Sequence, residues 1–378
     1  ALSPMAYFAQ FDQDAACVAM VTASHNENGW TGVKMGARRP LTFGPEEMGR
    51  LREITLGGAG VERPGGRLMR VEGVRERYIA DCASRAQVTR PLKVVAACGN
   101  GTAGAFAPDA LRAMGVEVIE LDTRLDWTFP KYNPNPEDHG MLQDMAAAVR
   151  EHGADLCFGF DGDGDRCGVV DDAGEEIYAD KIGLMLARDL SAVHPNATFV
   201  VDVKSTGLYA TDPVLKANGA RVDYWKTGHS YIKRRTAELG ALAGFEKSGH
   251  FFFNDPLGRG YDDALVAAAN ILNLLERNPG KRLSDLRAAL PDAWTSLTMS
   301  PHCDDEVKYR VLEEVVAEYE ALAASGGTIL GRRITEVITV NGARVHLDDG
   351  SWVLVRASSN KPELVVVEES MRSEADMR

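Results

Sequence analysis

The middle of the chain alternates short apolar runs with helical runs, and this alternation constrains the fold more than any other feature. Strand-like runs at 93–98, 116–121 and 154–160 are separated by helical runs at 106–115 and 141–153. A strand, a helix and a strand in succession predict parallel strands joined by right-handed crossovers. The same rhythm returns in strands predicted at 198–203, 221–225 and 241–246 and helices predicted at 182–193, 208–219 and 231–240. We therefore predict two mixed α/β units in tandem.

The two ends of the chain differ from this middle part. Residues 306–325 form one long helical run, and the strand patterns that follow it are typical of antiparallel hairpins, which predicts a smaller C-terminal α+β domain. The region before residue 82 has one clear strand at 17–23 and a helical run at 45–57, and it looks like a fragment of a domain. The predicted domains are 1–82, 83–178, 179–290 and 291–378.

Composition excludes several classes of protein. The formal net charge is −13, from 42 Lys and Arg against 55 Asp and Glu, which argues against general nucleic-acid binding because that function needs a basic face. No apolar run approaches the roughly 20 residues that cross a membrane, and the first residues lack the pattern of a signal peptide. The six cysteines contain no CxxC pair, which predicts reduced thiols. We expect a cytoplasmic location and no nucleic-acid or membrane partner.

The string DGDGDR at 161–166 carries the most chemistry. Asp161, Asp163 and Asp165 alternate with two glycines directly after a predicted strand, so a tight loop brings three carboxylates together. Such carboxylates repel one another unless a divalent cation lies among them. A solvated acidic turn is the alternative, whereas an EF-hand does not fit because Arg166 stands where that loop requires glycine. An arginine beside a metal loop indicates an anionic ligand.

Ser24 lies where the strand at 17–23 opens into a polar loop, followed by His25 and, further along, Lys34. This is a common location for an exposed nucleophile, although a serine at the end of a strand is more often a cap or turn residue. The chain disfavours a serine hydrolase, since it has no GxSxG string and GHSYI at 228–232 lacks the closing glycine.

The string GNGTAG at 99–104 is a complete GxGxxG that follows a predicted strand and precedes a predicted helix. The next strand ends near Asp122, where a ribose-binding acid would lie. This arrangement matches a dinucleotide site better than most chance matches, and the corresponding function is an NAD(P)-dependent oxidoreductase. The interpretation that we prefer is a glycine-rich turn that only permits close packing.

Polar side chains follow the strands of the second α/β unit, and we expect them to share one rim because ligands bind at the carboxyl ends of strands in open α/β sheets. They are Lys204, His229, Glu246, Ser248 and His250. A second set of anion donors follows a strand near the C-terminus, where a plain surface turn is an equal alternative. Its members are Arg356, Ser358, Ser359, Asn360 and Lys361.

The order of these strings resembles the α-D-phosphohexomutase family, most of all its bacterial phosphomannomutase/phosphoglucomutase branch. TASHN at 22–26, DGDGDR, FEKSGH at 245–250 and RASSN at 356–360 occur in the family's order, and the resemblance runs from Leu2 to Glu369. It implies three mixed α/β domains and a C-terminal α+β domain around a central cleft. Family members have a longer segment before the serine, so we expect the first domain to be N-terminally incomplete, with low activity if the chain begins at Ala1.

The resemblance also implies an activity and a site. The implied enzyme interconverts the 1-phosphate and 6-phosphate of mannose or glucose through a phosphorylated serine and a 1,6-bisphosphate, with Mg²⁺ as cofactor and glucose 1,6-bisphosphate as activator. Ser24 resembles the phosphoryl carrier, Lys34 a general base and Arg166 a contact of the phosphoserine loop. The implied metal ligands are Ser24, Asp161, Asp163 and Asp165. The other implied residues are His25 and His229 in catalysis, Lys204, Glu246, Ser248 and His250 at the sugar, and Arg356, Ser358, Ser359 and Asn360 at the second phosphate.

Two loops depart from the family pattern. Phe245 stands where glycine is usual before the glutamate of the sugar loop, with Lys247 after it, and the phosphate loop reads RASSNKP. Both loops still supply hydrogen-bond donors, so the mutase prediction stands, while the preference among mannose, glucose and an amino sugar stays open. A non-catalytic sugar-phosphate-binding paralogue is the remaining alternative.

Overall fold

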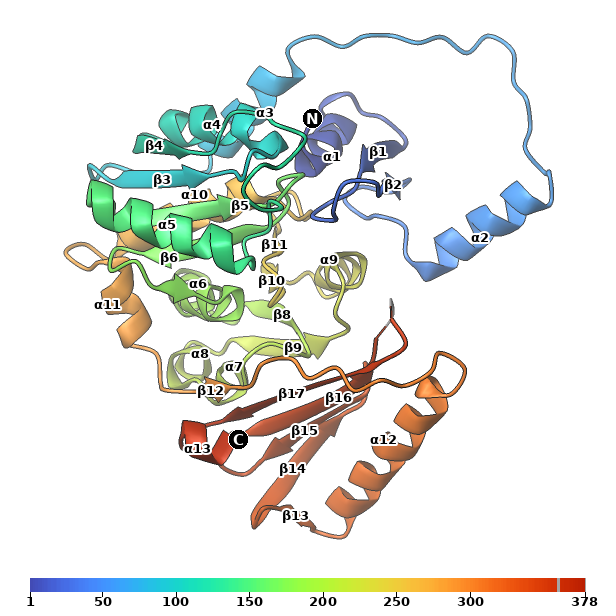
Figure 1. Cartoon of the computed structure of the whole chain (residues 1–378), viewed down its shortest axis with the longest axis vertical. Coiled ribbons are helices and arrows are strands. Elements are labelled where there is room, and N and C mark those ends of the chain that lie inside the picture. Colours follow the sequence, from blue (N-terminus) through green and yellow to red (C-terminus); the bar gives the residue numbers. More distant parts are fainter. Residues whose placement is uncertain (359–360, 378) are drawn as a thin grey trace.

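The computed structural model of the protein describes residues 1–358 and 361–377. Its strands form four sheets, each from a separate stretch of the chain (Figure 1). Among the described residues, no helix combines the length and the apolar character that crossing a membrane requires. The mixed α/β fold predicted from the sequence is confirmed, and the exact domain boundaries stay predictions.

The five-stranded sheet has the order β4-β3-β5-β6-β7, with parallel pairing of β3 to β4 and to β5 and antiparallel pairing of β6 and β7. The predicted strands and helices of this unit are present, and β6 and β7 are additional because the loop at 161–166 turns the chain back beside β5. The elements are β3 (Lys93–Ala97), η1 (Thr102–Ala105), α4 (Ala107–Ala113), β4 (Glu117–Leu121), α5 (His139–His152), β5 (Leu156–Phe160), β6 (Cys167–Asp171) and β7 (Glu176–Ile177).

The four-stranded sheet has the order β11-β10-β8-β9, with β8 parallel to β9 and β10. The helix predicted at 208–219 is wrong as one element, because Asp212 and Pro213 divide it; proline has no N–H to continue a helix. The elements are α6 (Ala179–Val193), β8 (Thr198–Asp202), α7 (Leu208–Thr211), α8 (Pro213–Ala217), β9 (Arg221–Trp225), α9 (His229–Glu238), β10 (Ala243–Phe245), β11 (Phe251–Phe253), α10 (Ala264–Arg277) and α11 (Leu283–Ala288).

Helix α10 joins these two units into one core. Its residues from Ala264 to Leu275 are buried, and it packs against α3, α4, α6, β6 and β11. A helix that is apolar on all sides fits only between other elements. One contiguous apolar cluster therefore runs from α1 through both sheets.

The N-terminal part contains an antiparallel pair, β1 and β2, and three helices. Helix α1 was not predicted; Tyr7 and Phe8 on it are buried and pack against Tyr261 and Tyr78. Figure 1 shows α2 and the segment after it lying away from the sheets. The elements are α1 (Ser3–Asp12), β1 (Val18–Thr22), β2 (Gly32–Gly36), α2 (Pro45–Leu56) and α3 (Val74–Ala83).

The C-terminal part is a six-stranded sheet of order β12-β17-β16-β15-β14-β13, in which every strand pair is antiparallel, with α12 packed on β14, β15 and β16. The predicted long helix and hairpin strands are confirmed. The elements are β12 (Trp294–Thr295), α12 (Lys308–Ala324), β13 (Thr328–Ile329), β14 (Arg332–Ile338), β15 (Ala343–Leu347), β16 (Trp352–Ala357), β17 (Leu364–Ser370) and α13 (Glu374–Met377).

A buried arginine attaches this sheet to the loop that follows β8. The guanidinium of Arg344 lies over the rings of Tyr224 and Trp352, at 4.2 and 3.8 Å. Its Nη1 donates hydrogen bonds to the carbonyl oxygens of Val203 (2.6 Å) and Ser205 (2.8 Å). A planar cation that both stacks and donates can be buried in this way where a lysine could not.

A buried glutamate completes the same attachment. Glu369 Oε1 accepts hydrogen bonds from Gly207 N (2.8 Å), Thr206 Oγ1 (3.0 Å) and Trp352 Nε1 (2.9 Å), and Oε2 lies 3.4 Å from Lys181 Nζ. Burial alone would raise the pKa of Glu369, but the charge of Lys181 and these donors lower it to about 2. The ionised carboxylate is therefore the form that holds the two parts together.

We expect Glu369→Gln to remove part of the acid sensitivity of folding. Because the folded-state pKa is depressed, the stabilisation is present above the ordinary pKa of 4.5 and is lost as pH falls from there through about 2. The shift corresponds to about 3 kcal/mol. Urea unfolding measures this difference. From about pH 6 down to about pH 3, the free energy of unfolding should fall more steeply in the wild type than in the variant.

Glu368→Gln is the matched control, because burial raises the pKa of Glu368 and gives it the opposite pH dependence. An unchanged slope in Glu369→Gln would contradict the assigned role of Glu369.

Candidate active site

The loop at 161–166 is folded around one of its own carboxylates. Asp161 Oδ1 accepts hydrogen bonds from the backbone N–H groups of Gly164 (3.0 Å), Asp165 (3.1 Å) and Arg166 (3.1 Å). Gly164 has a φ of +74°, in the left-handed region that favours glycine. This turn brings single ligand atoms of Asp161, Asp163 and Asp165 within 4.8 Å of one another, and all three side chains are buried.

The three aspartates fit a hard divalent cation. Asp161 Oδ2, Asp163 Oδ1 and Asp165 Oδ1 are buried and accept no hydrogen bond from the described residues. Burial, together with the charges of Asp165 and Asp163, raises the pKa of Asp161 well above its ordinary value. Oxygen donors with this charge are the ligands that Mg²⁺ or Ca²⁺ prefers. The predicted cluster of three carboxylates is thus present. That it binds a metal ion, and that Ser24 is one of the ligands, stay predictions.

Ser24 lies directly over this loop, at the end of β1. Its φ is +55°, which is uncommon for a residue other than glycine and marks a constrained turn. Ser24 N donates a hydrogen bond to Thr22 Oγ1 (2.8 Å), which donates to Asp163 Oδ2 (2.8 Å). A Cβ on Gly162 would lie 2.5 Å from the Ser24 carbonyl oxygen, so glycine allows the two loops to touch. Ser24 also lines a cavity of about 360 Å³ together with Gly162 and Asp163.

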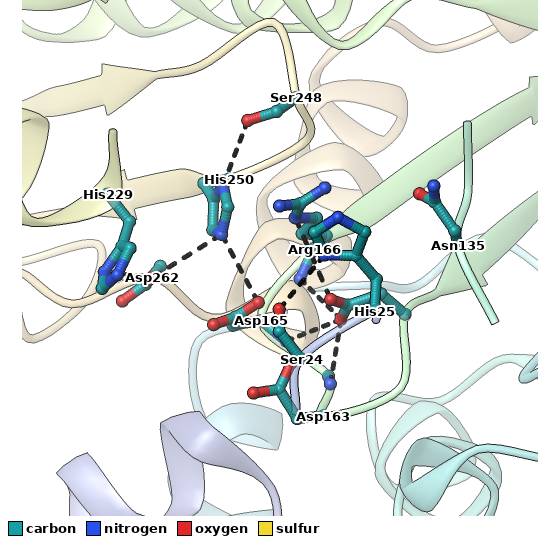
Figure 2. Close-up of polar contacts among 12 residues, drawn as sticks. Ser24, His25, Asn135, Asp163, Asp165, Arg166, His229, Ser248, His250 and Asp262 are labelled. Carbon is teal, nitrogen blue, oxygen red and sulfur yellow. Dashed lines mark hydrogen bonds and ion pairs between the residues drawn. The ribbon is translucent and has the colours of Figure 1, made fainter. Parts of the chain in front are cut away.

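His25 is the side chain next to the Ser24 hydroxyl. Its Nδ1 lies 3.3 Å from Ser24 Oγ (Figure 2). Burial and the positive charge of Arg166 lower the pKa of His25 to about 4, so the imidazole is neutral near pH 7. A neutral imidazole at this distance can accept a proton from the hydroxyl group.

Lys34 reaches the same carboxylates from β2. The pairing of Met20 with Lys34 and of Thr22 with Gly32 places Thr22 and Lys34 on one face of the hairpin. Lys34 Nζ lies 2.8 Å from Asp163 Oδ2 and also contacts Asp165. Burial alone would lower the pKa of Lys34, but the charges of Asp165 and Asp163 raise it well above its ordinary value. In this arrangement Lys34 is a proton-bearing cation, so the predicted role of general base requires that these contacts change.

The sugar loop lies on the other side of Asp165. It turns sharply between β10 and β11, with Glu246 N donating to the His250 carbonyl (3.0 Å). His250 Nδ1 lies 3.1 Å from Glu246 Oε2 and from Ser248 Oγ, and Nε2 lies 3.4 Å from Asp165 Oδ1 (Figure 2). Burial alone would lower the pKa of His250, but the charge of Asp165 and the close contacts with Asp165 and Glu246 raise it to about 10.

Asp262, which sequence reasoning missed, connects the two histidines of this region. Its Oδ2 lies 3.6 Å from His229 Nδ1 and 4.0 Å from His250 Nε2, and the two rings stack at 5.8 Å. Its Oδ1 lies 2.7 Å from Lys233 Nζ, and neither side chain of this pair is exposed. Lys233 in turn lies over the ring of Tyr7 at 4.2 Å. The pairing of Arg166 with His250 as an isolated bridge brings the metal loop and the sugar loop together.

Asp202, also missed, ties together three loops at the carboxyl ends of β8, β9 and β10. Its carboxylate accepts hydrogen bonds from Ser205 Oγ (2.6 Å), Thr227 Oγ1 (2.9 Å) and Lys247 N (3.2 Å). The rule that ligands bind at the ends of strands would have found it, since Asp202 is the last residue of β8. The rim predicted for this sheet is therefore held by one buried carboxylate.

The remaining predicted residues lie at the margin of this network. Arg166 is close to Glu137 and Asp161, at 3.8 and 3.9 Å. The charge of Lys204 is one of the causes that lower the pKa of Glu246. Arg356 is close enough to Asp202 and Glu246 to respond to their charges, although burial lowers its pKa overall.

Of the serines and the asparagine in the predicted phosphate loop, the structure describes Ser358. Ser358 is buried, and its carbonyl accepts from Lys308 Nζ (2.5 Å). Among the contacts of the described residues, none joins the Ser358 side chain to the metal or sugar loops. The predictions for Ser359 and Asn360 concern residues outside those that the structure describes.

The glycine-rich turn at 99–104 is used for packing. The N–H groups of Asn100, Gly101 and Thr102, which a pyrophosphate would need, donate to the carbonyls of Asp122, Cys98 and Gly162. A Cβ on Gly104 would fall against the Thr123 carbonyl. The side chain of Asp122 contacts Lys131 and Tyr132. These contacts disfavour the dinucleotide site and, with it, the oxidoreductase.

Comparisons with known proteins match this arrangement. Three family models, described as phosphoglucomutase/phosphomannomutase alpha/beta/alpha domains I, II and III, match residues 1–59, 76–174 and 178–294. A phosphomannomutase/phosphoglucomutase of Pseudomonas putida is 32% identical over 374 residues, 99% of this chain and 76% of that protein. A phosphoglucomutase of Neisseria meningitidis is 33% identical over 376 residues, 99% of this chain and 77% of that protein.

A solved structure extends the match to the whole fold. The crystal structure of a phosphoglucomutase/phosphomannomutase family protein from Burkholderia thailandensis superimposes with a TM-score of 0.82 at 32% identity, covering 96% of this chain and 73% of that chain. The fold and the buried aspartate loop beneath a strand-end serine place the chain among phosphohexose-processing α/β enzymes. The chain belongs to the phosphoglucomutase/phosphomannomutase family.

We expect Asp202→Ala to destabilise the protein by about 3 kcal/mol, because it leaves several buried donors without an acceptor. Asp223→Ala is the matched control on the neighbouring strand; it removes a half-buried ion pair with Arg235 and should cost less than about 1 kcal/mol. Thermal or urea unfolding of the two variants measures the difference. Equal losses would show that Asp202 does not organise the rim.

Proposed function

We propose that the protein is a phosphohexose mutase, which interconverts a hexose 1-phosphate and the corresponding 6-phosphate through phosphorylated Ser24. The observation that carries this proposal is the contact between Ser24 and the buried aspartate loop, made through Thr22 and Gly162. Phosphoryl transfer needs neutralised charge and fixed geometry more than covalent chemistry. A nucleophile held against a cation-binding loop supplies both.

Asp161, Asp163 and Asp165 would hold Mg²⁺, which supplies charge neutralisation at the transferring phosphoryl group when it is bound. In the first half of the reaction, the bond between phosphorus and Ser24 Oγ breaks as the bond to the free sugar hydroxyl forms; that hydroxyl loses its proton and Ser24 Oγ takes one up, giving a 1,6-bisphosphate and a free serine. In the second half, after the bisphosphate turns around, Ser24 Oγ attacks the other phosphate, and the sugar oxygen that leaves takes up a proton. His25 accepts the hydroxyl proton in that step and returns it in the reverse step, since its neutral ring lies 3.3 Å from Oγ.

We assign a different role to the two cationic side chains, Lys34 and His250. Lys34 and His250 hold protons on either side of Asp165, and they donate to the oxygens that gain charge during transfer. Glu246 and Ser248 bind sugar hydroxyls, with Lys204 and His229 beside the sugar. Arg356 binds the phosphate that is not transferred, and it is joined in this role by Ser358, Ser359 and Asn360. The substrate is a phosphorylated mannose or glucose, and glucose 1,6-bisphosphate is the activator.

The phosphoryl carrier can be identified by intact mass. The wild type should show an adduct of about 80 Da, the mass of one phosphoryl group, that Ser24→Ala lacks. Ser3→Ala is the matched control, because Ser3 Oγ also lies against Asp163 (2.6 Å). The adduct should survive in Ser3→Ala, whereas its survival in Ser24→Ala would place the phosphoryl group elsewhere.

The metal assignment predicts that Asp163→Asn loses at least about 100-fold in Mg²⁺-dependent turnover. A coupled assay with glucose 1-phosphate and catalytic glucose 1,6-bisphosphate measures it. Asp172→Asn is the control, since that nearby carboxylate contacts Ser284 and Arg282 instead. Full activity of Asp163→Asn would contradict the assignment.

A wild type that binds sugar phosphate without turnover would favour the non-catalytic alternative. Parallel assays with mannose and glucosamine 1-phosphates rank the sugars.

A further inference from the structure

His250 Nε2 faces two carboxylate oxygens that belong to different elements. Asp165 Oδ1 comes from the loop after β5 and lies 3.4 Å from Nε2, and Asp262 Oδ2 comes from the turn before α10 and lies 4.0 Å away. Figure 2 shows the imidazole between these two carboxylates. The three ligand atoms lie within 4.8 Å of one another, and all three side chains are buried.

The neighbouring lysines leave these two oxygens free. Lys34 contacts Asp165 through Oδ2, and Lys233 lies 2.7 Å from Asp262 Oδ1. Asp165 Oδ1 and Asp262 Oδ2 are therefore the oxygens on the side of the His250 imidazole, although Asp262 Oδ2 lies closer to His229 Nδ1 (3.6 Å). Each of the two oxygens is buried and accepts no hydrogen bond from the described residues. A buried carboxylate oxygen without a donor is costly unless a cation or a proton occupies the space beside it.

The other face of the imidazole is already oriented. His250 Nδ1 lies 3.1 Å from Glu246 Oε2, and a carboxylate oxygen can only accept, so Nδ1 carries the hydrogen of this contact. Ser248 Oγ lies at the same distance from Nδ1. A histidine that binds a metal characteristically donates its second N–H to a carboxylate in this way, which directs the lone pair of the first nitrogen to the ion.

We propose that Asp165, His250 and Asp262 form a second cation site, which shares the oxygen Asp165 Oδ1 with the site of Asp161, Asp163 and Asp165. One nitrogen and two oxygen donors suit a borderline transition-metal ion such as Zn²⁺ or Co²⁺, whereas the all-oxygen first site suits Mg²⁺. A cation bound here requires the lone pair of Nε2, so it can bind only when that nitrogen carries no hydrogen.

A cation in this site prevents His250 from donating a hydrogen bond to the oxygens that gain charge during phosphoryl transfer, because Nε2 can hold either a proton or the metal. Zn²⁺ bound here therefore inhibits the enzyme even when excess Mg²⁺ keeps the first site filled. The site itself does not depend on the proposed function, because metal binding is measured without turnover.

The test uses Co²⁺ as the probe, with the full chain freed of metal by a chelator. Equilibrium dialysis should give two Co²⁺ per wild-type chain, and the four-coordinate site with a nitrogen ligand should add strong visible absorption that a six-coordinate oxygen site lacks. Asp163→Asn, which removes a ligand of the first site and none of the second, should keep the absorption and lose one equivalent. His250→Gln, which removes a ligand of the second site and none of the first, should keep one equivalent and lose the absorption. Excess Mg²⁺ should displace only the ion that does not absorb.

Asp262→Asn also removes a ligand of the second site, but it disrupts the buried pair of Asp262 and Lys233. If that variant fails to fold, His250→Gln still tests the site, because it leaves the pair intact. Circular dichroism and thermal unfolding verify the fold of each variant. One Co²⁺ per wild-type chain, or absorption unchanged in His250→Gln, would overturn the proposal. Complete loss of Co²⁺ binding in Asp163→Asn would overturn it as well, because the aspartate loop would then be the sole site.

Discussion

The arrangement of the site depends on one carboxylate oxygen, Asp163 Oδ2. It accepts hydrogen bonds from Ser3 Oγ at the start of α1 (2.6 Å), from Thr22 Oγ1 at the end of β1 (2.8 Å) and from Lys34 Nζ on β2 (2.8 Å). Three separate pieces of the N-terminal part are thus held against the loop of the five-stranded sheet. Because Thr22 also accepts from Ser24 N, the position of the nucleophile follows from the same oxygen.

Charge balance explains why this buried cluster can exist. The aspartates of the loop, Glu246 and Asp262 place several negative charges in one region of low exposure, which would be unfavourable without partners. Lys34 contacts Asp163 and Asp165, the protonated His250 contacts Asp165 and Glu246, and Lys233 contacts Asp262. The lysines use one oxygen of Asp165 and of Asp262 and leave the other toward His250. Carboxylate oxygens that can bind a cation therefore remain on both sides of Asp165, in the aspartate loop and on Asp262.

The sequence predicted the repeating strands and helices well, because their apolar periodicity is a local property. It predicted the aspartate loop for a similar reason, since residue type and spacing carried the chemistry. The role of Ser24 came from the family resemblance and stays a prediction. Asp262 and Lys233 could not be found this way. Asp263 caps α10 by accepting from Leu265 N and Val266 N, so the pair of aspartates before this helix looks like an ordinary helix start. Only the tertiary fold shows that Asp262 turns the other way, into the site. Helix α1 was missed because its partners, Tyr78 and Tyr261, lie far along the chain.

The C-terminal sheet shows how a distant network sets the geometry of a binding group. Arg344 on β15 is fixed to the carbonyls of Val203 and Ser205, next to Lys204, and Glu369 on β17 is fixed to Thr206 and Gly207. Strand β16 lies between β15 and β17, and it ends at Arg356 and Ala357. A strand paired on both sides has little freedom to shift its register. The position of Arg356 relative to Asp202 and Glu246 is thus determined by two buried attachments, and within the described part of the chain neither attachment contacts the aspartate loop.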